Sequence, residues 1–272
     1  MAGSLQLAAG AATGQPPYTS GAGRVSTGVR QDPEQLWLVR HGQSQGNVAR
    51  DLAHADRAEV LDIAERDMDV PLSDLGRVQS VALGRWMADQ ADRPNVVICS
   101  PYLRSVQTAE ILLEAAGMDL EVHLDERLRE REFGVLDLLT RHGIEARFPA
   151  EAERRRRLGK FYHRPPGGES WVDVALRIRS LRDSMGREHL DKRVLVVSHE
   201  VVVVVWRYLL DNLNEQEALQ LSREHPIGNC SLTRYLTNTD DLLQLDLDAW
   251  TAPLEASDVP VTLDKDAPIA PR

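Results

Sequence analysis

The sequence contains few cysteines and no apolar run long enough to cross a membrane. Two of its 272 residues, Cys99 and Cys230, are cysteines, and each lies in a strand-like stretch, which favours buried reduced thiols over a disulfide. The most apolar run, residues 201–205, has a histidine and charged residues close by, whereas a membrane span needs about 20 apolar residues. We therefore expect a soluble, cytoplasmic protein with no membrane partner.

Several metal and nucleotide motifs are also absent. The eight histidines form no HExxH pair, the cysteines form no cluster, and there is no GxxxxGK loop, so neither a metal nor a cofactor is expected. A formal net charge of −10 disfavours nucleic acid as a general partner. One basic run, residues 154–157, is flanked by Glu151 and Glu153 and is interpreted as a solvated helix face.

Both ends of the chain lack apolar periodicity. Residues 1–34 are rich in Gly, Ala, Ser and Thr, and residues 249–272 carry proline and aspartate, so both are predicted to be disordered tails around one domain at 35–248. The first residues show no basic cluster followed by an apolar core, which argues against a secretory signal. An organellar transit peptide is a minority alternative, and a homo-oligomer remains open.

Between these tails, strand-like and helix-like segments alternate, which favours an α/β fold. Ser73 is predicted to cap an amphipathic helix, and Ser170 with Asp173 forms a capping-box-like start to a helix that ends near Gly186. A further helix is expected over residues 100–117. Strands are expected at 36–39, 96–99, 120–124, 194–197, 231–236 and 242–247.

The most informative stretch is LWLVRHGQSQGN, residues 36–47, in which a buried-strand pattern ends on Arg40 and His41. Burying these two side chains within a sheet would cost much desolvation free energy, so we expect them at the carboxyl edge, where ligand crevices open. A neutral imidazole is a nucleophile, a guanidinium matches phosphate oxygens, and Gly42 lets the backbone approach a ligand closely. The pattern predicts phosphoryl chemistry, and polar side chains suited to binding the same anion follow at Gln43, Ser44 and Asn47.

This stretch resembles the RHGxSxxN signature of the histidine phosphatase superfamily, in its phosphoglycerate-mutase-like branch. The fixed positions of such a motif match by chance in about one in ten thousand chains of this length, so the likeness is specific. The resemblance implies an α/β three-layer sandwich, with helices on both faces of a mainly parallel sheet.

The segment SPYLRSVQTAE, residues 100–110, adds a second guanidinium, Arg104, near the start of a predicted helix. Free backbone donors and a partial positive charge at a helix N-terminus favour an anion there. The segment is similar to the family motif SPxxRxxQT, which implies that Arg104 is the second phosphate-binding arginine. A surface arginine on a helix is the alternative.

The segment LREREFG, residues 128–134, is similar to the family motif LxExxxG, which implies that Glu130 is the proton donor. An alkoxide leaves poorly, so a carboxylic acid kept protonated by neighbouring phosphate charge would lower the barrier. Glu132 is the alternative donor, because several acidic residues crowd this stretch.

The segment VLVVSHE, residues 194–200, repeats the pattern of an apolar strand followed by a histidine, and the resemblance implies that His199 is the second active-site histidine. It would donate a hydrogen bond to phosphate and help to orient the nucleophile. Glu200 departs from the family, in which glycine is common here. Because a carboxylate facing phosphate would oppose anion binding, we expect Glu200 to point towards a basic partner or to modify the entrance. The valines at 201–205 favour a strand by propensity, but the family has a helix here, which we expect.

Residues 135–168 separate the proton-donor segment from a GGES turn, and in the family this interval builds a cap over the substrate. The string GKFYHRPPGGES resembles broad-range acid phosphatases of the family. Solvated charges on an insertion are an equal alternative to a second anion-binding group, for which the candidates are Lys160, Tyr162 and Arg164.

The resemblance as a whole implies a metal-independent phosphatase that acts on a small phosphorylated metabolite through a phosphohistidine. His41 would attack phosphorus and Glu130 would protonate the leaving oxygen. The phosphoryl oxygens would be held by Arg40, Arg104, Asn47 and His199. A mutase of the phosphoglycerate type, which would use the same residues, is the second interpretation. A non-catalytic phosphate-binding module is the third, since neither the nucleophile nor an arginine is missing.

Overall fold

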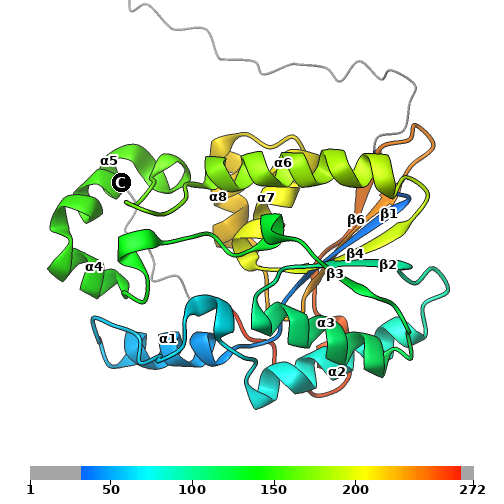
Figure 1. Cartoon of the computed structure of the whole chain (residues 1–272), viewed down its shortest axis with the longest axis horizontal. Coiled ribbons are helices and arrows are strands. Elements are labelled where there is room, and N and C mark those ends of the chain that lie inside the picture. Colours follow the sequence, from blue (N-terminus) through cyan, green and yellow to red (C-terminus); the bar gives the residue numbers. More distant parts are fainter. Residues whose placement is uncertain (1–31, 265–272) are drawn as a thin grey trace, which may run out of the picture.

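The computed structural model describes residues 32–264, and its centre is one six-stranded mixed sheet (Figure 1). The first four strands in the order across the sheet are mutually parallel, whereas the last two pair antiparallel, so the parallel strands all end at one edge. The order is β3 (Val122–Leu124), β2 (Val96–Cys99), β4 (Arg193–Ser198), β1 (Gln35–Arg40), β5 (Leu232–Thr237) and β6 (Leu243–Trp250).

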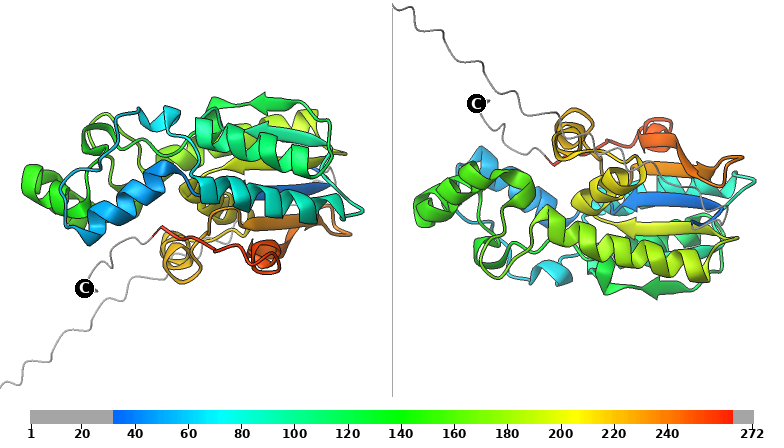
Figure 2. Two further views of the ribbon diagram at one scale, coloured as in Figure 1. Left: turned by 90° about the horizontal axis from the view of Figure 1, so that it is seen from below. Right: turned by 90° about the horizontal axis from the view of Figure 1, so that it is seen from above.

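Helices cover both faces of this sheet (Figure 2). One face carries α2 (Asp74–Ala88), α3 (Leu103–Ala115) and the short α9 (Ala252–Glu255). The other face carries α6 (Trp171–Glu188), α7 (Glu200–Leu210) and α8 (Glu215–Glu224). Beyond the carboxyl edge of the parallel strands, at the left of Figure 1, lie α1 (Gln45–Ala55), α4 (Arg141–Arg147) and α5 (Pro149–Tyr162). Short 3₁₀ turns form at η1 (Asp67–Asp69), η2 (Glu126–Leu128) and η3 (Gly134–Leu136).

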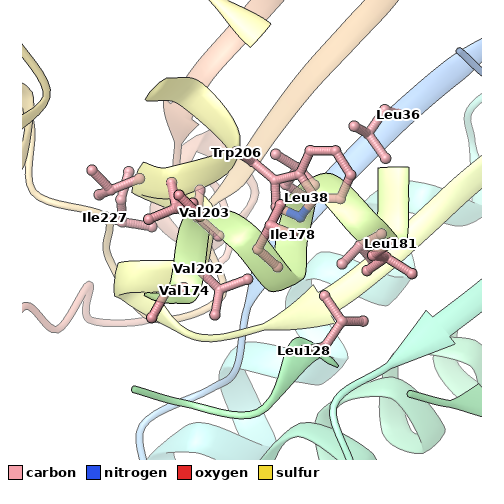
Figure 3. Packing of buried hydrophobic residues seen from close by; sticks show 14 of the residues in the cluster. Leu36, Leu38, Leu128, Val174, Ile178, Leu181, Val202, Val203, Trp206 and Ile227 are labelled. Carbon is pink, nitrogen blue, oxygen red and sulfur yellow. The ribbon is translucent and has the colours of Figure 1, made fainter. Parts of the chain in front are cut away.

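Strand β1 is buried on both faces, which fixes its position in the sheet. Leu36 and Leu38 pack into the apolar cluster under α6 and α7, as Figure 3 shows, whereas Trp37 and Val39 enter the opposite cluster under α2 and α3. All four side chains are fully buried, and each such burial stabilises the fold by about 1.5–3 kcal/mol. Because a one-residue slip would exchange the two faces, the register of β1 is strongly specified, and so is the place where the strand ends.

The helix expected at residues 201–205 is confirmed as part of α7. The valines from Val202 to Val205 are all fully buried, so packing on the sheet outweighs the small helix penalty of β-branched residues. The predicted caps are also confirmed, because Ser73 accepts a hydrogen bond from the backbone of α2 and Ser170 forms a capping box with Asp173 in α6.

Two predicted helix ends differ from the structure. The helix expected from residue 100 begins at Leu103, because Tyr102 has an extended backbone and is the N-cap residue. Helix α6 continues past Gly186 to Glu188, since a glycine inside a helix costs only about 1 kcal/mol and does not by itself end it.

Residues 249–264, expected to belong to a disordered tail, instead pack on the domain. Leu254 is fully buried, and Val259 and Val261 pack against the cluster under α2 and α3. The spacing of these apolar residues follows no helix or strand period, because α9 is only 4 residues long and residues 256–264 form neither helix nor strand, so sequence periodicity could not detect this segment. At the other end, Asp32 is buried and pairs with Arg182 at 2.5 Å. The remainder of both predicted tails, 1–31 and 265–272, lies outside the described residues.

Cys99 and Cys230 are both buried free thiols, as predicted. Within residues 32–264, none of the helices is long and apolar enough to cross a membrane. The cytoplasmic location stays a prediction.

Candidate active site

The carboxyl ends of β1 and β4 bring two histidines together. These strands are parallel neighbours, with Arg40 opposite Ser198, so the next residues, His41 and His199, leave the sheet side by side. The backbone N–H of His41 donates to the carbonyl of Ser198 at 2.9 Å. The two imidazole rings meet edge to face with centroids 5.1 Å apart, and both side chains are buried. Sheet register therefore sets the distance between the two predicted catalytic histidines.

His41 is arranged as a neutral nucleophile. Its Nδ1 atom lies 2.7 Å from the carbonyl oxygen of Gly42, and because a carbonyl only accepts hydrogen bonds, Nδ1 carries the proton. The lone pair is then on Nε2. Burial, followed by the charges of Arg104 and Arg40, holds the pKa of His41 well below its ordinary value. The imidazole is thus neutral near neutral pH, with Nε2 unprotonated, as attack on phosphorus requires.

His199 is held by the residue that follows β2. Its Nε2 atom lies 2.8 Å from the hydroxyl of Ser100, while its buried Nδ1 atom makes no hydrogen bond and lies 3.9 Å from Oε2 of Glu130. Burial, and then the charges of Arg104 and His41, lowers its pKa well below the ordinary value. The ring atom without a partner therefore faces the same space as Glu130.

Arg40 is almost completely buried beside the histidines, and its guanidinium already has several partners. Nη1 donates to the carbonyl of Ile227 at 2.6 Å, and Nη2 donates to Asp264 at 2.6 Å. Glu200 lies 3.6 Å away, so the basic partner expected for Glu200 is Arg40 itself. The buried Nε of Arg40 has no hydrogen-bond partner. An oxyanion at Nε would satisfy this donor.

Arg104 supplies the second guanidinium from the first turn of α3. It is 5% exposed and lies with its Cζ atom 5.0 Å from the ring centre of Tyr102, whose ring in turn lies 5.1 Å from that of His199. Nη1 donates to the carbonyl of Asp67 at 2.5 Å, and the Asp67 carboxylate lies 3.1 Å from the same nitrogen. Arg104 is therefore part of the buried cluster and not a surface residue.

Glu130 is a carboxyl group whose acid form is favoured. Burial raises its pKa above the ordinary value and the charge of Asp67 adds to this, although a bond from the Arg131 backbone and the nearby arginines act in the opposite direction. Arg177 fixes the backbone of the segment that carries Glu130, because it donates to the carbonyls of Arg127 and Glu130. The alternative donor, Glu132, accepts a hydrogen bond from the Tyr102 hydroxyl at 2.9 Å, so it has a different partner.

A sequence model of the histidine phosphatase superfamily (branch 1) matches residues 36–247, which is most of the chain and includes both histidines, both arginines and Glu130. The chain belongs to this superfamily. The resemblance found in its motifs is thereby confirmed, and so is the predicted α/β fold with a mainly parallel sheet.

Relatives within the family include both mutases and phosphatases. A 2,3-bisphosphoglycerate-dependent phosphoglycerate mutase of Rhizobium meliloti (strain 1021) is 30% identical over 190 residues, covering 69% of this chain and 84% of that protein. A glucosyl-3-phosphoglycerate phosphatase of Mycobacterium tuberculosis (strain CDC 1551 / Oshkosh) is 29% identical over 236 residues, covering 82% and 96%. A solved structure of mycobacterial glucosyl-3-phosphoglycerate phosphatase with VO3 superposes with a TM-score of 0.61 at 28% identity, covering 79% of this chain and 98% of that one.

Some polar residues of the histidine phosphatase motif support the site without facing it. Ser44 caps α1, and its backbone N–H and hydroxyl both donate to Oδ1 of Asn47. The side-chain NH₂ group of Asn47 is then left to donate to a group outside α1. Gln43 accepts hydrogen bonds from Ser73 through its carbonyl and its side chain. A Cβ at Gly42 would lie 2.5 Å from the carbonyl oxygen of Gly76, so the backbone approaches α2 closely there, while its approach to a ligand stays a prediction.

The three cap candidates have contacts away from the histidines. The ammonium of Lys160 lies 5.2 Å from the ring centre of Trp171 in α6. Tyr162 is 54% exposed beside Phe161, and Arg164 pairs with Asp173 at 3.4 Å. These contacts give no support to a role in substrate binding, which stays a prediction. The expected cap interval itself contains α4 and α5.

Sequence reasoning missed four residues that contact the site. Ser100 bonds His199, although the sequence places it only at the start of a predicted helix, and Asp67 lies in a segment that carries no motif. Asn229 donates to the carbonyl of His41 at 3.0 Å and to Asn47 at 3.4 Å. Asp264 belongs to the segment expected to be a tail. Of these four residues, only Ser100 lies within a recognised motif, SPxxR, so only its place in the site could have been predicted from the sequence.

No group of three or more His, Cys, Asp or Glu side chains in residues 32–264 is placed to hold a metal ion. Metal-independent chemistry stays a prediction, because only an activity measurement in the absence of metal ions can test it.

Proposed function

We propose that this member of the superfamily is a phosphomonoester hydrolase that acts on small phosphorylated metabolites through a phosphohistidine at His41. The observation that carries the proposal is the state of His41: it is neutral, its Nδ1 is occupied by the Gly42 carbonyl, and its Nε2 is available beside two buried arginines.

In the first step, the lone pair on Nε2 of His41 attacks phosphorus and the bond between phosphorus and the leaving oxygen breaks. Glu130 gives its proton to that oxygen, so the product leaves as an alcohol. In the second step, the Glu130 carboxylate takes a proton from a water molecule that attacks the phosphohistidine. The bond from phosphorus to Nε2 breaks, and inorganic phosphate leaves.

Charge on the phosphoryl oxygens is balanced by Arg40 and Arg104, and the Nδ1–H group of the neutral His199 donates a hydrogen bond to them. These groups are buried and already oriented, so they need little reorganisation when negative charge develops in the transition state. Asn47 adds a neutral donor through its amide. No metal ion takes part in the proposed steps.

Phosphoglycerate-mutase activity is the second candidate, favoured by the relative in Rhizobium meliloti. A mutase would return the phosphoryl group from His41 to the substrate before water could attack. Hydrolysis is placed first because the mycobacterial phosphatase aligns over more of both chains than that mutase does. A non-catalytic phosphate-binding module ranks third, since all the residues required for phosphoryl transfer are present.

The decisive experiment incubates the full chain with a panel of ³²P-labelled metabolites, including 3-phosphoglycerate, and follows labelled protein, free phosphate and isomerised substrate. Acid-labile, base-stable label on His41 with release of phosphate supports the hydrolase. Isomerised substrate with little free phosphate identifies a mutase. An absence of label and turnover in wild type, or normal turnover by His41→Ala, contradicts the covalent mechanism.

A further inference from the structure

The carboxylate of Asp264 accepts hydrogen bonds from groups that the proposed mechanism uses to hold phosphate. Its Oδ2 atom accepts from Nη2 of Arg40 at 2.6 Å and from Nη1 of Arg50 at 3.2 Å, and its Oδ1 atom accepts from the Asn47 amide at 2.8 Å. The two carboxylate oxygens thus bind one nitrogen of the Arg40 guanidinium and the Asn47 amide, on two residues that the proposed function assigns to phosphoryl oxygens. Arg40 and Asn47 come from β1 and α1, whereas Asp264 is distant in sequence, 224 residues after Arg40.

A folded strap, formed by residues 259–264, brings Asp264 to this place. Val259 and Val261 pack against the apolar cluster under α2 and α3. Gln79 donates to the carbonyl of Pro260 and to the hydroxyl of Thr262, and the backbone N–H of Asn229 donates to the Thr262 carbonyl at 2.9 Å. Figure 2 shows the strap in red, returning from α9 towards α1. One residue, Leu263, separates the last anchor, Thr262, from Asp264, so the Asp264 carboxylate is held near Arg40 at a high effective concentration.

Asp264 is negatively charged and is held by two arginines, as a bound anion would be. Burial would raise the pKa of Asp264, but Arg40 and then Arg50 outweigh it and hold the pKa at about 2. The group is therefore a carboxylate near neutral pH. Its side chain is 18% exposed, so an anion from solvent can reach the position that the carboxylate occupies.

We propose that Asp264 is a built-in competitor for the phosphate-binding groups of this site, and that a substrate's phosphoryl group must displace it to reach Arg40 and Asn47. The proposal rests on the proposed function, which assigns these two residues to phosphoryl oxygens. Arg40 Nη2 and the Asn47 amide cannot serve both anions at once. Displacement therefore subtracts from substrate affinity, while the chemistry after displacement is unaffected.

The contrary interpretation makes Asp264 a positioning residue that holds Arg40 in its working orientation. The two interpretations predict opposite changes in anion affinity when Asp264 is replaced. Loss of a competitor tightens anion binding and lowers KM at nearly constant kcat, whereas loss of a positioning residue weakens binding, lowers kcat, or does both.

The test measures binding of inorganic phosphate by calorimetry, and KM and kcat on one phosphomonoester, for wild type, Asp264→Asn and Asp264→Ala in the full chain. Loss of the charge-assisted hydrogen bonds should tighten phosphate binding and lower KM by about tenfold or more, with kcat changed by less than about threefold. Asp258→Asn is the matched control, because it removes the same charge from an exposed position in the same C-terminal segment. It should leave all three quantities within about twofold.

Unchanged or weaker phosphate binding in both Asp264 variants overturns the proposal, as does an equal gain in Asp258→Asn, which would reflect net charge alone. Absence of phosphate binding in wild type and variants also overturns it. Tighter phosphate binding in the Asp264 variants without turnover of any phosphomonoester would support the competitor while contradicting the hydrolase. A thermal unfolding curve for each variant confirms that binding is compared between folded proteins.

Discussion

The hydroxyl of Ser100 lies 2.8 Å from Nε2 of His199, and both side chains are completely buried. The same oxygen accepts a longer hydrogen bond from the backbone N–H of Tyr102 at 3.3 Å, a bond that does not use the hydroxyl proton, so Ser100 can donate this proton to His199. Donation from Ser100 to Nε2 places the imidazole proton on Nδ1, the atom that faces Glu130. Ser100 thus selects the tautomer in which His199 can donate to a phosphoryl oxygen.

Replacing Ser100 with alanine should lower kcat/KM by about five- to thirtyfold, because a buried hydrogen bond worth ~1–2 kcal/mol no longer fixes the tautomer. The loss should fall mainly on kcat, since His199 acts on charge that develops in the transition state. Ser100→Thr keeps the hydroxyl and should recover most of the activity. Ser105→Ala is the matched control, because its hydroxyl lies 3.5 Å from the same nitrogen, and a loss as large as that of Ser100→Ala would contradict the assignment.

Replacing Arg104 with alanine should reduce kcat/KM by at least about 10²-fold, ~3 kcal/mol, because a buried, oriented guanidinium is removed from the developing charge. Steady-state kinetics at several pH values would measure this. Arg66→Ala is a matched control in the neighbouring loop, since that side chain is 76% exposed and pairs with Asp69. A loss of kcat/KM below about tenfold for Arg104→Ala would mean that Arg104 has a structural role and does not stabilise the transition state.

Glu130→Gln keeps the shape of the side chain and removes the acid, so its effect should depend on the leaving group. Transfer from an alkyl phosphate should slow by about 10² to 10⁴, because the alkoxide then leaves without a proton. Transfer from p-nitrophenyl phosphate, measured as a single-turnover burst, should be largely spared because its phenol is acidic. Glu132→Gln is the control: it loses its bond to Tyr102 but should show no dependence on the leaving group. Equal losses on both substrates in Glu130→Gln would mean that Glu130 binds or supports the site without donating a proton.

The free energy of unfolding should fall as the pH drops below 6.5. His41 and His199 both have pKa values lowered by burial and then by neighbouring positive charge, so in this range the unfolded chain binds protons that the folded protein does not. Each histidine that stays neutral should contribute a slope of about 1.4 kcal/mol per pH unit. The stabilisation is complete above the unfolded pKa and is lost on acidification.

Urea unfolding in a buffer free of phosphate, from about pH 7 to about pH 5, would measure this slope. His41→Asn and His199→Asn should each make the slope shallower, whatever their effect on stability at pH 7. His123→Gln, at an exposed position, is the control and should leave the slope unchanged. If neither active-site variant alters the slope, these histidines do not remain neutral on acidification.

Much of the site could be predicted because its main residues follow local patterns. Arg40, His41 and His199 come directly after apolar strands, where a charged or titratable side chain must leave the core, and Arg104 lies near a helix start inside a motif. Helix α7 shows the limit of local reasoning. Propensity favoured a strand at residues 201–205, and only the family resemblance gave the correct helix, which is stabilised by burial on the sheet.

The sequence by itself determined which strands form and which functional side chains end them, because burial and desolvation act on short runs of residues. Tertiary structure decided what those side chains contact. Ser100 reaches His199 across 99 residues, and Asp264 reaches Arg40 across 224, through sheet register in the first case and an irregular strap in the second. Neither contact leaves a period in the sequence, since each depends on where two distant segments pack and not on the local order of polar and apolar residues.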